Sequence, residues 1–445
     1  MREGSLDAPI RHVIDWESES FYDELELDKE LRRVFDICHG CRRCFNLCNS
    51  FPTLFDLIDE SASGELDGVK SEDFPKVVEE CTLCDLCFVN KCPYVPPHEF
   101  DVDFPHLMLR HRAVEAKKNG ISFVEKQLSK TDQIGKIATK VASIANWATS
   151  TSNGPVRKVM EVTAGIDKTV ELPTYSKSTL CQQVEMSPAI TNVKGPAYGE
   201  KAVLFATCFG NYNNPAIGRA ALSVLAHQGV ETEVMYPGCC GMPLFEKGDL
   251  KAVAEQAEKI STALKPYIEK GIPVISIIPS CSLMLKSEWP LLLPKNEDVQ
   301  RLSKCVMDIS EYVIHLHKKY SLAHGLEPLE SKSVTLHLAC HSRAQNIGAK
   351  AAEMLRLIPE LNVQIIERCS GHGGTWGIMK EHFQTALKVG KPTAKQALSA
   401  DNPIVLSECP LAAKHILQGM HMQKEKVNTY ATMHPIELMA RSYQV

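Results

Sequence analysis

The sequence predicts a multidomain protein in which a helical N-terminal domain precedes two copies of an α/β domain with a parallel sheet. Three observations support this prediction. The chain has 445 residues, which is enough for about three domains. Eight of its 17 cysteines stand in two closely spaced sets near the N-terminus. The second half alternates short β-branched runs with longer helical stretches, and this pattern occurs twice.

Composition and charge exclude several classes of protein. Hydrophobic residues make up 44% and charged residues 23%, as in ordinary globular proteins, so neither a disordered nor a fibrous chain is expected. A net charge of −5 offers no basic surface for nucleic acid. The opening MREGSLDAPIRHV has no apolar signal region, and no apolar run reaches the ~18 residues of a membrane-spanning helix. Cysteine-rich chains without a secretion signal indicate the cytoplasm, and metal binding rather than disulfides.

Residues 1–30 form an acidic segment that we expect to be a solvated face, and residues 31–115 form the helical domain. Two cysteine motifs recur there, CHGCRRCFNLC and CTLCDLCFVNKCP. Three cysteines spaced three apart on a tight loop can face one cuboidal cluster, and in two-cluster bacterial ferredoxins the remote cysteine ligates the other cluster. We therefore expect an α-helical two-cluster ferredoxin domain with two [4Fe–4S] clusters. One would be held by Cys38, Cys41, Cys44 and Cys92, and the other by Cys81, Cys84, Cys87 and Cys48.

Two details depart from the ferredoxin pattern. Cys48 is followed by Asn49, with Pro52 only later, and one extra residue separates Cys87 from Cys92. Either change alters a loop without removing a ligand. A pair of structural zinc sites is the alternative, because four cysteines also suit tetrahedral Zn²⁺. The paired triplets favour iron–sulfur clusters.

Residues 116–195 are predicted to be a helical linker. It contains an apolar stripe at helical spacing that either packs on a neighbouring domain, which we favour, or lies in a membrane surface beside a quinone pool. The stripe consists of Ile134, Ile137, Val141 and Ile144, with Lys136 and Lys140 displaced from it. Near this linker, His98, His106 and His111 are expected to be packed or hydrogen-bonded rather than proton carriers. Cys181 and Cys305 lack partners at ligand spacing and are expected to be small buried hydrophobes.

Residues 196–328 and 329–445 are predicted to be two duplicated α/β cysteine-rich domains. The runs AVLFA, TEVMY and VISII recur as VTLHL, VQIIE and PIVLS, and the cysteines after them recur 132, 130 and 128 residues later. A nearly constant lag indicates internal duplication. Because parallel strands end at one edge of a sheet, each copy should gather its cysteines there. The first copy offers Cys208, Cys239, Cys240 and Cys281, and the second offers Cys340, Cys369 and Cys409.

The first set is predicted to be a metal or redox site that carries any catalysis. The second set is poorer, because Cys369-Ser370-Gly371 stands where the first copy has Cys239-Cys240-Gly241. A serine hydroxyl is a much weaker ligand for a soft metal than a thiolate. Three alternatives stay open for the second set: a cluster with one non-cysteine ligand, reactive thiols, or a degenerate copy. His341 and His372 are candidate substitutes or acid–base groups.

Over residues 38–445 these motifs resemble the cysteine-rich (CCG) domain iron–sulfur oxidoreductases, which include the C component of anaerobic glycerol-3-phosphate dehydrogenase and the D component of heterodisulfide reductase. The segment ELPTYSKSTL is also similar to the glycerol-3-phosphate dehydrogenase type. The resemblance implies a ferredoxin part that relays single electrons and cysteine-rich domains that bind a further iron–sulfur centre. In the family each copy ends with CxxC, whereas Met284 and Ala412 take the last position here. Both copies therefore lack the last thiolate of a full heterodisulfide-type cluster.

The leading hypothesis is an iron–sulfur electron-transfer subunit. No GxGxxG opens a helix after a strand, so a separate flavoprotein dehydrogenase is expected as the electron donor. The resemblance implies a quinone or another acceptor, and a cytoplasmic chain held peripherally on the inner face of the membrane. The alternatives are an enzyme that reduces a disulfide, persulfide or peroxide-derived substrate at the CCG cysteines, and a metal-stapled scaffold. The stretch CTLCDLCFVNKCPYVPPHEF is also similar to family members associated with rubrerythrin, a peroxide-handling protein.

Overall fold

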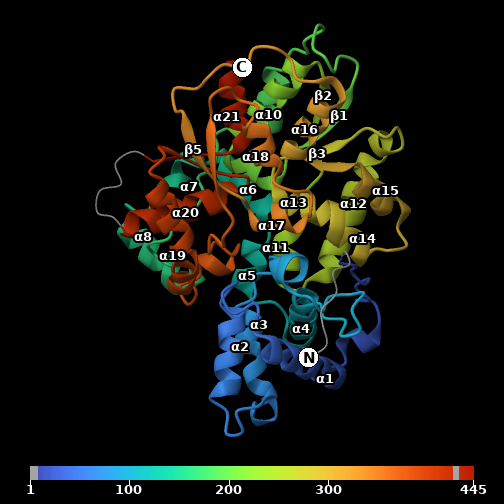
Figure 1. Ribbon diagram of the computed structural model, residues 1–445, viewed down its shortest axis with the longest axis vertical. Coiled ribbons are helices and arrows are strands. Elements are labelled where there is room, and N and C mark those ends of the chain that lie inside the picture. Colours follow the sequence, from blue (N-terminus) through green and yellow to red (C-terminus); the bar gives the residue numbers. More distant parts are fainter. Residues whose placement is uncertain (1–8, 424–429) are drawn as a thin grey trace.

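The computed structural model describes residues 9–423 and 430–445 as a mainly helical protein with two separate parallel sheets. A helical N-terminal domain lies at one end of the long axis, and both sheets lie toward the other end (Figure 1). The predicted fold class is confirmed. Within the described stretches, the search for a helix with the length and hydropathy of a membrane span finds none. The domain boundaries predicted at residues 115, 195 and 328 stay a prediction.

The N-terminal domain is a bundle of helices around an aromatic core. Its first helix begins at Asp23, whose carboxylate accepts the N–H groups of Leu25 and Glu26 and so caps the helix. Phe35 on that helix lies edge-to-face on Phe74, with ring centroids 5.1 Å apart. The helices are α1 (Glu24–Cys41), α2 (Ser50–Asp59), α3 (Phe74–Glu79) and α4 (Phe104–Asn119), with short turns η1 (Glu19–Tyr22), η2 (Leu66–Gly68), η3 (Ser71–Asp73) and η4 (Cys87–Lys91).

The segment before α1 corrects one expectation. Residues 10–16 are only partly a solvated face: Ile10, His12, Val13 and Asp15 are exposed, but Ile14 is buried and the segment ties the N-terminal domain to the first repeat. The Ile10 N–H donates to the carbonyl of Pro96 at 3.0 Å, and the Ile14 N–H donates to the carbonyl of Leu291 at 2.9 Å. The indole N–H of Trp16 adds a bond to the Leu292 carbonyl at 2.9 Å. The acidic composition concealed these contacts because backbone groups and one tryptophan make them.

The linker is helical, as expected, and contacts both repeats: α6 and α9 pack on the first, and residues 165–170 bond to the second. It comprises α5 (Phe123–Leu128), α6 (Thr131–Lys140), α7 (Ala142–Thr149), α8 (Gly154–Ala164) and α9 (Leu180–Met186). The apolar stripe does not pack as we favoured, because Ile137 is 67% exposed and Ile144 is 65% exposed. The buried side of α6 instead carries Gly135 against the ring of Tyr212, where an added Cβ would clash at 2.3 Å.

Each repeat contains a four-stranded parallel sheet with the same topology. The orders are β2-β1-β3-β4 and β6-β5-β7-β8, so the duplication extends to the connectivity. The first repeat comprises β1 (Lys201–Phe205), η5 (Phe209–Asn213), α10 (Pro215–Gln228), β2 (Glu231–Met235), α11 (Met242–Phe245), α12 (Leu250–Ile268), β3 (Val274–Ser276), α13 (Pro279–Leu283), η6 (Met284–Glu288), α14 (Trp289–Leu292), α15 (Glu297–Cys305), β4 (Val306–Asp308) and α16 (Ile309–Tyr320). The second comprises β5 (Ser333–His337), α17 (Cys340–Ala344), α18 (Lys350–Leu355), β6 (Asn362–Ile366), η7 (Trp376–Ile378), α19 (Phe383–Ala400), β7 (Ile404–Ser407), α20 (Pro410–Gln423), β8 (Ala431–Met433) and α21 (Pro435–Tyr443).

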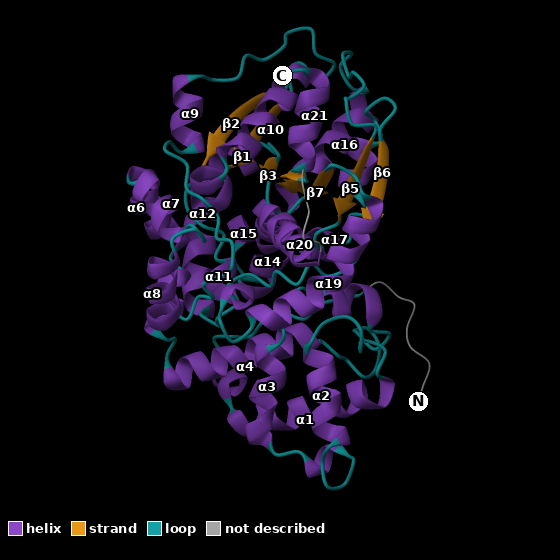
Figure 2. Cartoon of the chain, turned by 90° about the vertical axis from the view of Figure 1, so that its left-hand side faces the viewer, coloured by secondary structure: helices purple, strands orange, loops and turns teal. Residues whose placement is uncertain are grey.

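Six of the eight strands match the predicted β-branched runs, and β4 and β8 were missed. Each missed strand has three residues, too few to show a pattern of its own. They pair because β3 and β7 already offer open edges. The strands lie between helices on both sides (Figure 2), and β1 and β3 are buried along almost their whole length. Parallel strands covered on both faces end at one edge, where the cysteines follow them.

Candidate metal centres

Four thiols meet at the end of α1. Helix α1 runs through Cys38 and Cys41 and ends at Arg42, which adopts the left-handed conformation with φ 50°. The first motif therefore starts on a helical turn, not on the tight loop that we expected. Burial and then the thiols of its three partners raise the pKa of Cys38 well above its ordinary value. We call this set the first ferredoxin group: Cys38, Cys41, Cys44 and Cys92, which also line one pocket.

A second set of thiols lies beside the first. Burial raises the pKa of Cys48, and the thiols of Cys84 and Cys81 raise it further. Burial raises the pKa of Cys87 most, and thiols of both sets raise it further: Cys84, Cys81, Cys44 and Cys48. Cys87 therefore lies near both sets. The structure thus brings Cys48 from the first motif to the second motif, and Cys92 from the second motif to the first. The second ferredoxin group is Cys48, Cys81, Cys84 and Cys87.

Backbone N–H groups point at several of these sulfurs and lower the pKa of the thiols, against the effect of burial. In each case the donor lies two residues after the cysteine, which reflects a tight turn at the ligand. Such N–H···S bonds stabilise a thiolate and are one means by which proteins tune iron–sulfur clusters. The pairs are Cys48 with Ser50, Cys81 with Leu83, Cys84 with Leu86, Cys92 with Tyr94, Cys239 with Gly241 and Cys369 with Gly371.

No disulfide joins any of the 17 cysteines. Among the described residues, no group of three or more His, Cys, Asp or Glu side chains is arranged to hold a single metal ion. The choice between tetrahedral zinc sites and iron–sulfur clusters stays a prediction.

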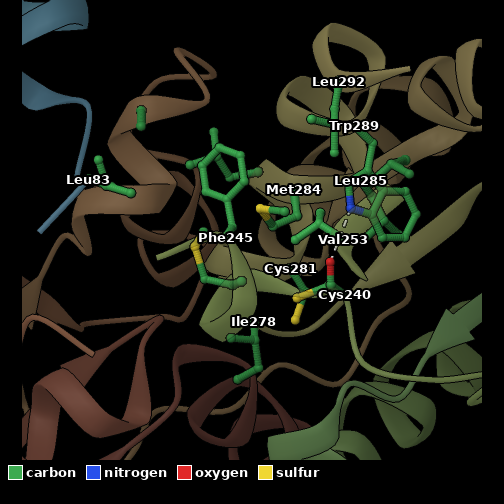
Figure 3. Close-up of a cluster of buried hydrophobic side chains, with 14 of the residues drawn as sticks. Leu83, Cys240, Phe245, Val253, Ile278, Cys281, Met284, Leu285, Trp289 and Leu292 are labelled. Atoms are coloured by element: carbon green, nitrogen blue, oxygen red, sulfur yellow. Dashed lines mark hydrogen bonds between the residues drawn. The ribbon is translucent and has the colours of Figure 1, made fainter. Parts of the chain in front are cut away.

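The first repeat gathers its four cysteines at the carboxyl edge of its sheet. Cys208 follows β1, and its Sγ atom lies 3.9 Å from that of Cys239. A chain of hydrogen bonds continues from Cys239 to Cys240 and from Cys240 to Cys281. Figure 3 shows Cys240 and Cys281 side by side, with the indole of Trp289 donating to the Cys240 carbonyl at 3.1 Å. The first-repeat group is Cys208, Cys239, Cys240 and Cys281.

One side chain at this group was missed by the sequence reasoning. The Cys239 N–H donates to Oδ2 of Asp132 at 3.0 Å, and the Tyr236 hydroxyl donates to the same carboxylate. Burial raises the pKa of Asp132 above its ordinary value. Asp132 lies in the first turn of α6, 107 positions before Cys239. Only the docking of α6, signalled by Gly135, brings it there.

The second repeat gathers three cysteines and adjoins the ferredoxin domain. Burial, then Cys84, Cys369 and Cys409, raise the pKa of Cys340. Burial, and after it the thiol of Cys369, raise the pKa of Cys84 to about 12. Burial, and after it the charges of Glu408 and Cys281, raise the pKa of Cys409. The second-repeat group is Cys340, Cys369 and Cys409.

The two candidate histidines of this repeat lie in different surroundings. His341 is buried and bonded to residues of two other domains: its Nδ1 lies 2.8 Å from Oγ of Ser280, and its Nε2 lies 3.3 Å from the carbonyl of Leu83. His372 packs against His415 instead, with ring centroids 6.2 Å apart, and burial lowers its pKa to about 3. The hydroxyl of Ser370 accepts the N–H of His372 at 3.3 Å.

The remaining singled-out residues have structural roles. His106 lies 2.9 Å from a carboxylate oxygen of Glu288, and Nδ1 of His98 accepts the N–H of Phe100 at 3.0 Å, as expected for hydrogen-bonded histidines. His111 is part-buried, and burial lowers its pKa. Cys181 and Cys305 are partly rather than fully buried, and both pack against the core away from the four cysteine groups.

A buried cation joins the ferredoxin domain to the first repeat. The guanidinium of Arg11 lies 2.8 Å from a carboxylate oxygen of Asp85, 2.8 Å from one of Asp103 and 3.1 Å from one of Glu288. Asp85 follows Cys84 directly, so the network borders the second ferredoxin group. Burial would raise the pKa of Asp103, but the charges of Arg11 and His106 outweigh it and the pKa falls to about 2.

The glycines of the two CxG turns allow a matched prediction. Gly241 and Gly371 both have positive φ, 86° and 79°, but a Cβ on Gly371 would lie 2.0 Å from the Ala386 carbonyl oxygen, whereas one on Gly241 meets only Val253 at 3.5 Å. Gly241→Ala should therefore cost only the left-handed strain of about 1–2 kcal/mol. Gly371→Ala must also displace α19 and should lower the melting temperature much further. Equal melting temperatures of the two anaerobically prepared variants would contradict this.

The fold is thus a helical cysteine-rich domain followed by two parallel α/β domains, each with cysteines at its sheet edge. The family model of the cysteine-rich domain, CCG, matches residues 202–286 and 334–413. The chain therefore carries two CCG domains, one in each repeat.

Three relatives illustrate the likeness. The C component of the anaerobic glycerol-3-phosphate dehydrogenase of Escherichia coli K12 is 29% identical over 71% of this chain and 76% of its own length. A protein of Methanocaldococcus jannaschii described as an iron–sulfur protein is 26% identical over 90% of this chain and 71% of its own length. The D component of the dihydromethanophenazine:CoB–CoM heterodisulfide reductase of Methanosarcina mazei is 26% identical over 49% of this chain and 53% of its own. The predicted resemblance is confirmed.

Proposed function

We propose that this chain is the iron–sulfur electron-transfer subunit of an oxidoreductase complex. One observation carries the proposal: the four cysteine groups form an unbroken series. Cys87 and Cys44 join the two ferredoxin groups. The series continues at His341, which follows Cys340 of the second-repeat group. Its ring contacts the Leu83 carbonyl, between Cys81 and Cys84, and the hydroxyl of Ser280, which precedes Cys281 of the first-repeat group. Such a series suits the movement of single electrons through a buried path.

The two ferredoxin groups fit [4Fe–4S] clusters. Each supplies four buried or partly buried thiols from crossed motifs, and backbone N–H groups already point at several sulfurs. We assign Cys38, Cys41, Cys44 and Cys92 to one cluster and Cys48, Cys81, Cys84 and Cys87 to the other. When bound, such clusters accept and release one electron each without making or breaking bonds to a substrate.

The first-repeat group fits a further iron–sulfur centre better than the second-repeat group does. The first-repeat group supplies four thiols within one hydrogen-bonded chain. The second-repeat group supplies three, because Ser370 stands where the first repeat has Cys240. The side chains around the first group orient it: Asp132 fixes the backbone of Cys239, and Trp289 fixes the carbonyl of Cys240. Buried Phe245 and Met284 help to exclude water from this region (Figure 3).

The partner in this proposal is a flavoprotein dehydrogenase that donates electrons, and the acceptor is a quinone or another carrier. An exposed apolar face supports contact with an apolar surface outside the chain: Ile137, Ile144 and Trp147 are 67%, 65% and 63% exposed. The exposed Lys136 and Lys140 lie on the same helices. A basic and apolar face of this kind suits an anionic membrane surface, in keeping with a cytoplasmic chain held on the inner face of the membrane. A rubrerythrin-linked donor stays a weaker hypothesis.

Anaerobic purification, with iron and sulfide counts and electron paramagnetic resonance (EPR), tests the proposal. The wild type should contain iron and give reduced [4Fe–4S] signals, and a colourless, iron-free protein would overturn it. The double variant Cys239→Ser, Cys240→Ser then separates relay from enzyme. A wild type that transfers electrons to quinone but reduces no disulfide, persulfide or peroxide-derived substrate supports the relay, and the double variant should then transfer electrons more slowly with its ferredoxin signals intact.

The second candidate function is a heterodisulfide-reductase-like enzyme that reduces a disulfide, persulfide or peroxide-derived substrate. The chain of hydrogen-bonded thiols in the first-repeat group favours it, because the bond to Cys208 lowers the pKa of Cys239. A thiol with a lowered pKa is the more reactive one at neutral pH. Loss of substrate reduction in the same double variant, with ferredoxin signals intact, would favour this function over the relay.

A further inference from the structure

His341 occupies the point where three parts of the chain meet. It lies on α17, directly after Cys340 of the second-repeat group. One ring nitrogen faces Ser280, which precedes Cys281 of the first-repeat group. The other faces the carbonyl of Leu83, between Cys81 and Cys84 of the second ferredoxin group. One imidazole thus contacts the neighbours of cysteines from three groups.

The hydrogen bonds define the state of the ring. The Leu83 carbonyl can only accept, so Nε2 of His341 carries a proton and donates it. Nδ1 is then the acceptor for the Ser280 hydroxyl, at 2.8 Å. A neutral imidazole with this tautomer satisfies both partners at once, and no other uncharged side chain of similar size spans them with a rigid ring.

The surrounding packing supports a fixed junction. Helix α13, which carries Ser280 and Cys281, packs directly against α17, which carries Cys340 and His341. Leu83 belongs to the same buried cluster as Ile278 and Cys281, although it comes from the ferredoxin domain (Figure 3). Leu83 itself has a positive φ of 48°, a strained conformation for a leucine, so the loop needs support from outside its own domain.

We propose that His341 is the positioning residue that holds the second ferredoxin group and the first-repeat group on either side of the second repeat's cysteines, so that electrons cross between the domains at this junction. The inference rests on the proposed function. Each crossing moves one electron: one group is oxidised, the next is reduced, and no covalent bond or proton changes place. The electrons come from the flavoprotein donor. The second repeat, poorer in thiols, then serves as the inner contact between the ferredoxin domain and the first repeat.

The test compares His341→Leu with His341→Gln, Ser280→Ala and the control His227→Leu. His227 also joins the repeats, because its ring packs on that of Tyr443 in α21 with centroids 4.6 Å apart. It lies at the end of α10, just before β2 begins, and so at the opposite edge of the sheets from the cysteines. The readouts on anaerobically purified protein are iron content, hydrogen exchange of residues 81–87, and freeze-quench EPR of the ferredoxin and CCG signals after one equivalent of reductant. The EPR also reports the magnetic coupling between the reduced centres.

His341→Leu should raise exchange at residues 81–87, weaken the coupling and slow equilibration between the signals by about 10-fold or more, the usual effect of losing a residue that orients metal ligands. His341→Gln should restore part of the rate, and Ser280→Ala, which leaves the histidine in place, should slow it less than His341→Leu. His227→Leu should leave coupling and rate unchanged.

Equal rates and coupling in wild type, His341→Leu and Ser280→Ala, with iron retained, would overturn the inference and leave the proposed function standing. Equal slowing in His227→Leu would overturn it as well, because the effect would then be general loosening. Should His341→Leu fail to fold, Ser280→Ala decides: a wild-type rate overturns the inference. Iron-free wild type would overturn the proposed function first.

Discussion

Replacing Cys48 with serine should remove the cluster held by Cys81, Cys84 and Cys87, although Cys48 belongs to the first cysteine motif in the sequence. The thiol of Cys48 lies near those of Cys81 and Cys84. The other cysteines of the first motif, Cys41 and Cys44, lie near Cys38 instead. The variant should therefore lose about four of the roughly eight irons expected for a two-cluster ferredoxin domain. Its remaining EPR signal should match that of Cys81→Ser and differ from that of Cys38→Ser.

The control for this experiment is Cys181→Ser. Cys181 is partly buried like the cluster cysteines but lies outside the four groups, so its loss should leave iron content and spectra unchanged. A Cys48→Ser spectrum that matches Cys38→Ser would mean that each motif holds its own cluster, and the crossed assignment would be wrong. A loss of iron in Cys181→Ser would show that iron content reports general instability.

Replacing Arg11 with methionine should strongly destabilise the junction between the ferredoxin domain and the first repeat. Methionine keeps much of the apolar stem but leaves the carboxylates of Asp85, Asp103 and Glu288 without their cation, and Glu288 is only 2% exposed. Removing one partner of a buried charge network costs about 3–5 kcal/mol. We expect a clearly lower melting temperature and faster proteolysis between the two parts. Thermal unfolding and limited trypsin digestion under anaerobic conditions measure these effects.

The matched control is the neighbouring residue. His12 makes an ion pair with Asp101 in which the two side chains are 67% and 53% exposed, and exposed pairs contribute little because water and salt screen them. His12→Ala should therefore melt close to the wild type. If Arg11→Met melted at the same temperature as His12→Ala, the buried network would not hold the domains together.

Sequence reasoning predicted what depends on local spacing. The two cysteine motifs and the lag between the repeats indicated which thiols share a group, and the structure brings together the same sets. The β-branched runs predicted six strands because each run has five residues and shows its own pattern, although β3 pairs over only three residues of its run. The three-residue strands β4 and β8 could not be predicted, because they exist only as partners of β3 and β7.

What depends on tertiary packing could not be predicted. Asp132 reaches Cys239 only because α6 docks through Gly135, and a lone aspartate at the start of a helix looks like any other helix cap. Cys84 lies near Cys340 because two domains pack against each other, and no periodic pattern in the sequence can predict such packing. His341 was a candidate only because it follows a cysteine. Its contacts with Ser280 and Leu83 come from two other domains.

The tie made by residues 10–16 bears on how the protein is assembled during synthesis. These residues leave the ribosome before the ferredoxin cysteines, whereas Glu288, a partner of Arg11, follows Arg11 by 277 positions. Domains generally fold as they emerge, N-terminal part first. The domain with the eight ferredoxin cysteines can therefore fold while residues 10–16 still lack their partners in the first repeat. We expect iron to be delivered in this interval, before the first repeat folds and packs against the ferredoxin domain.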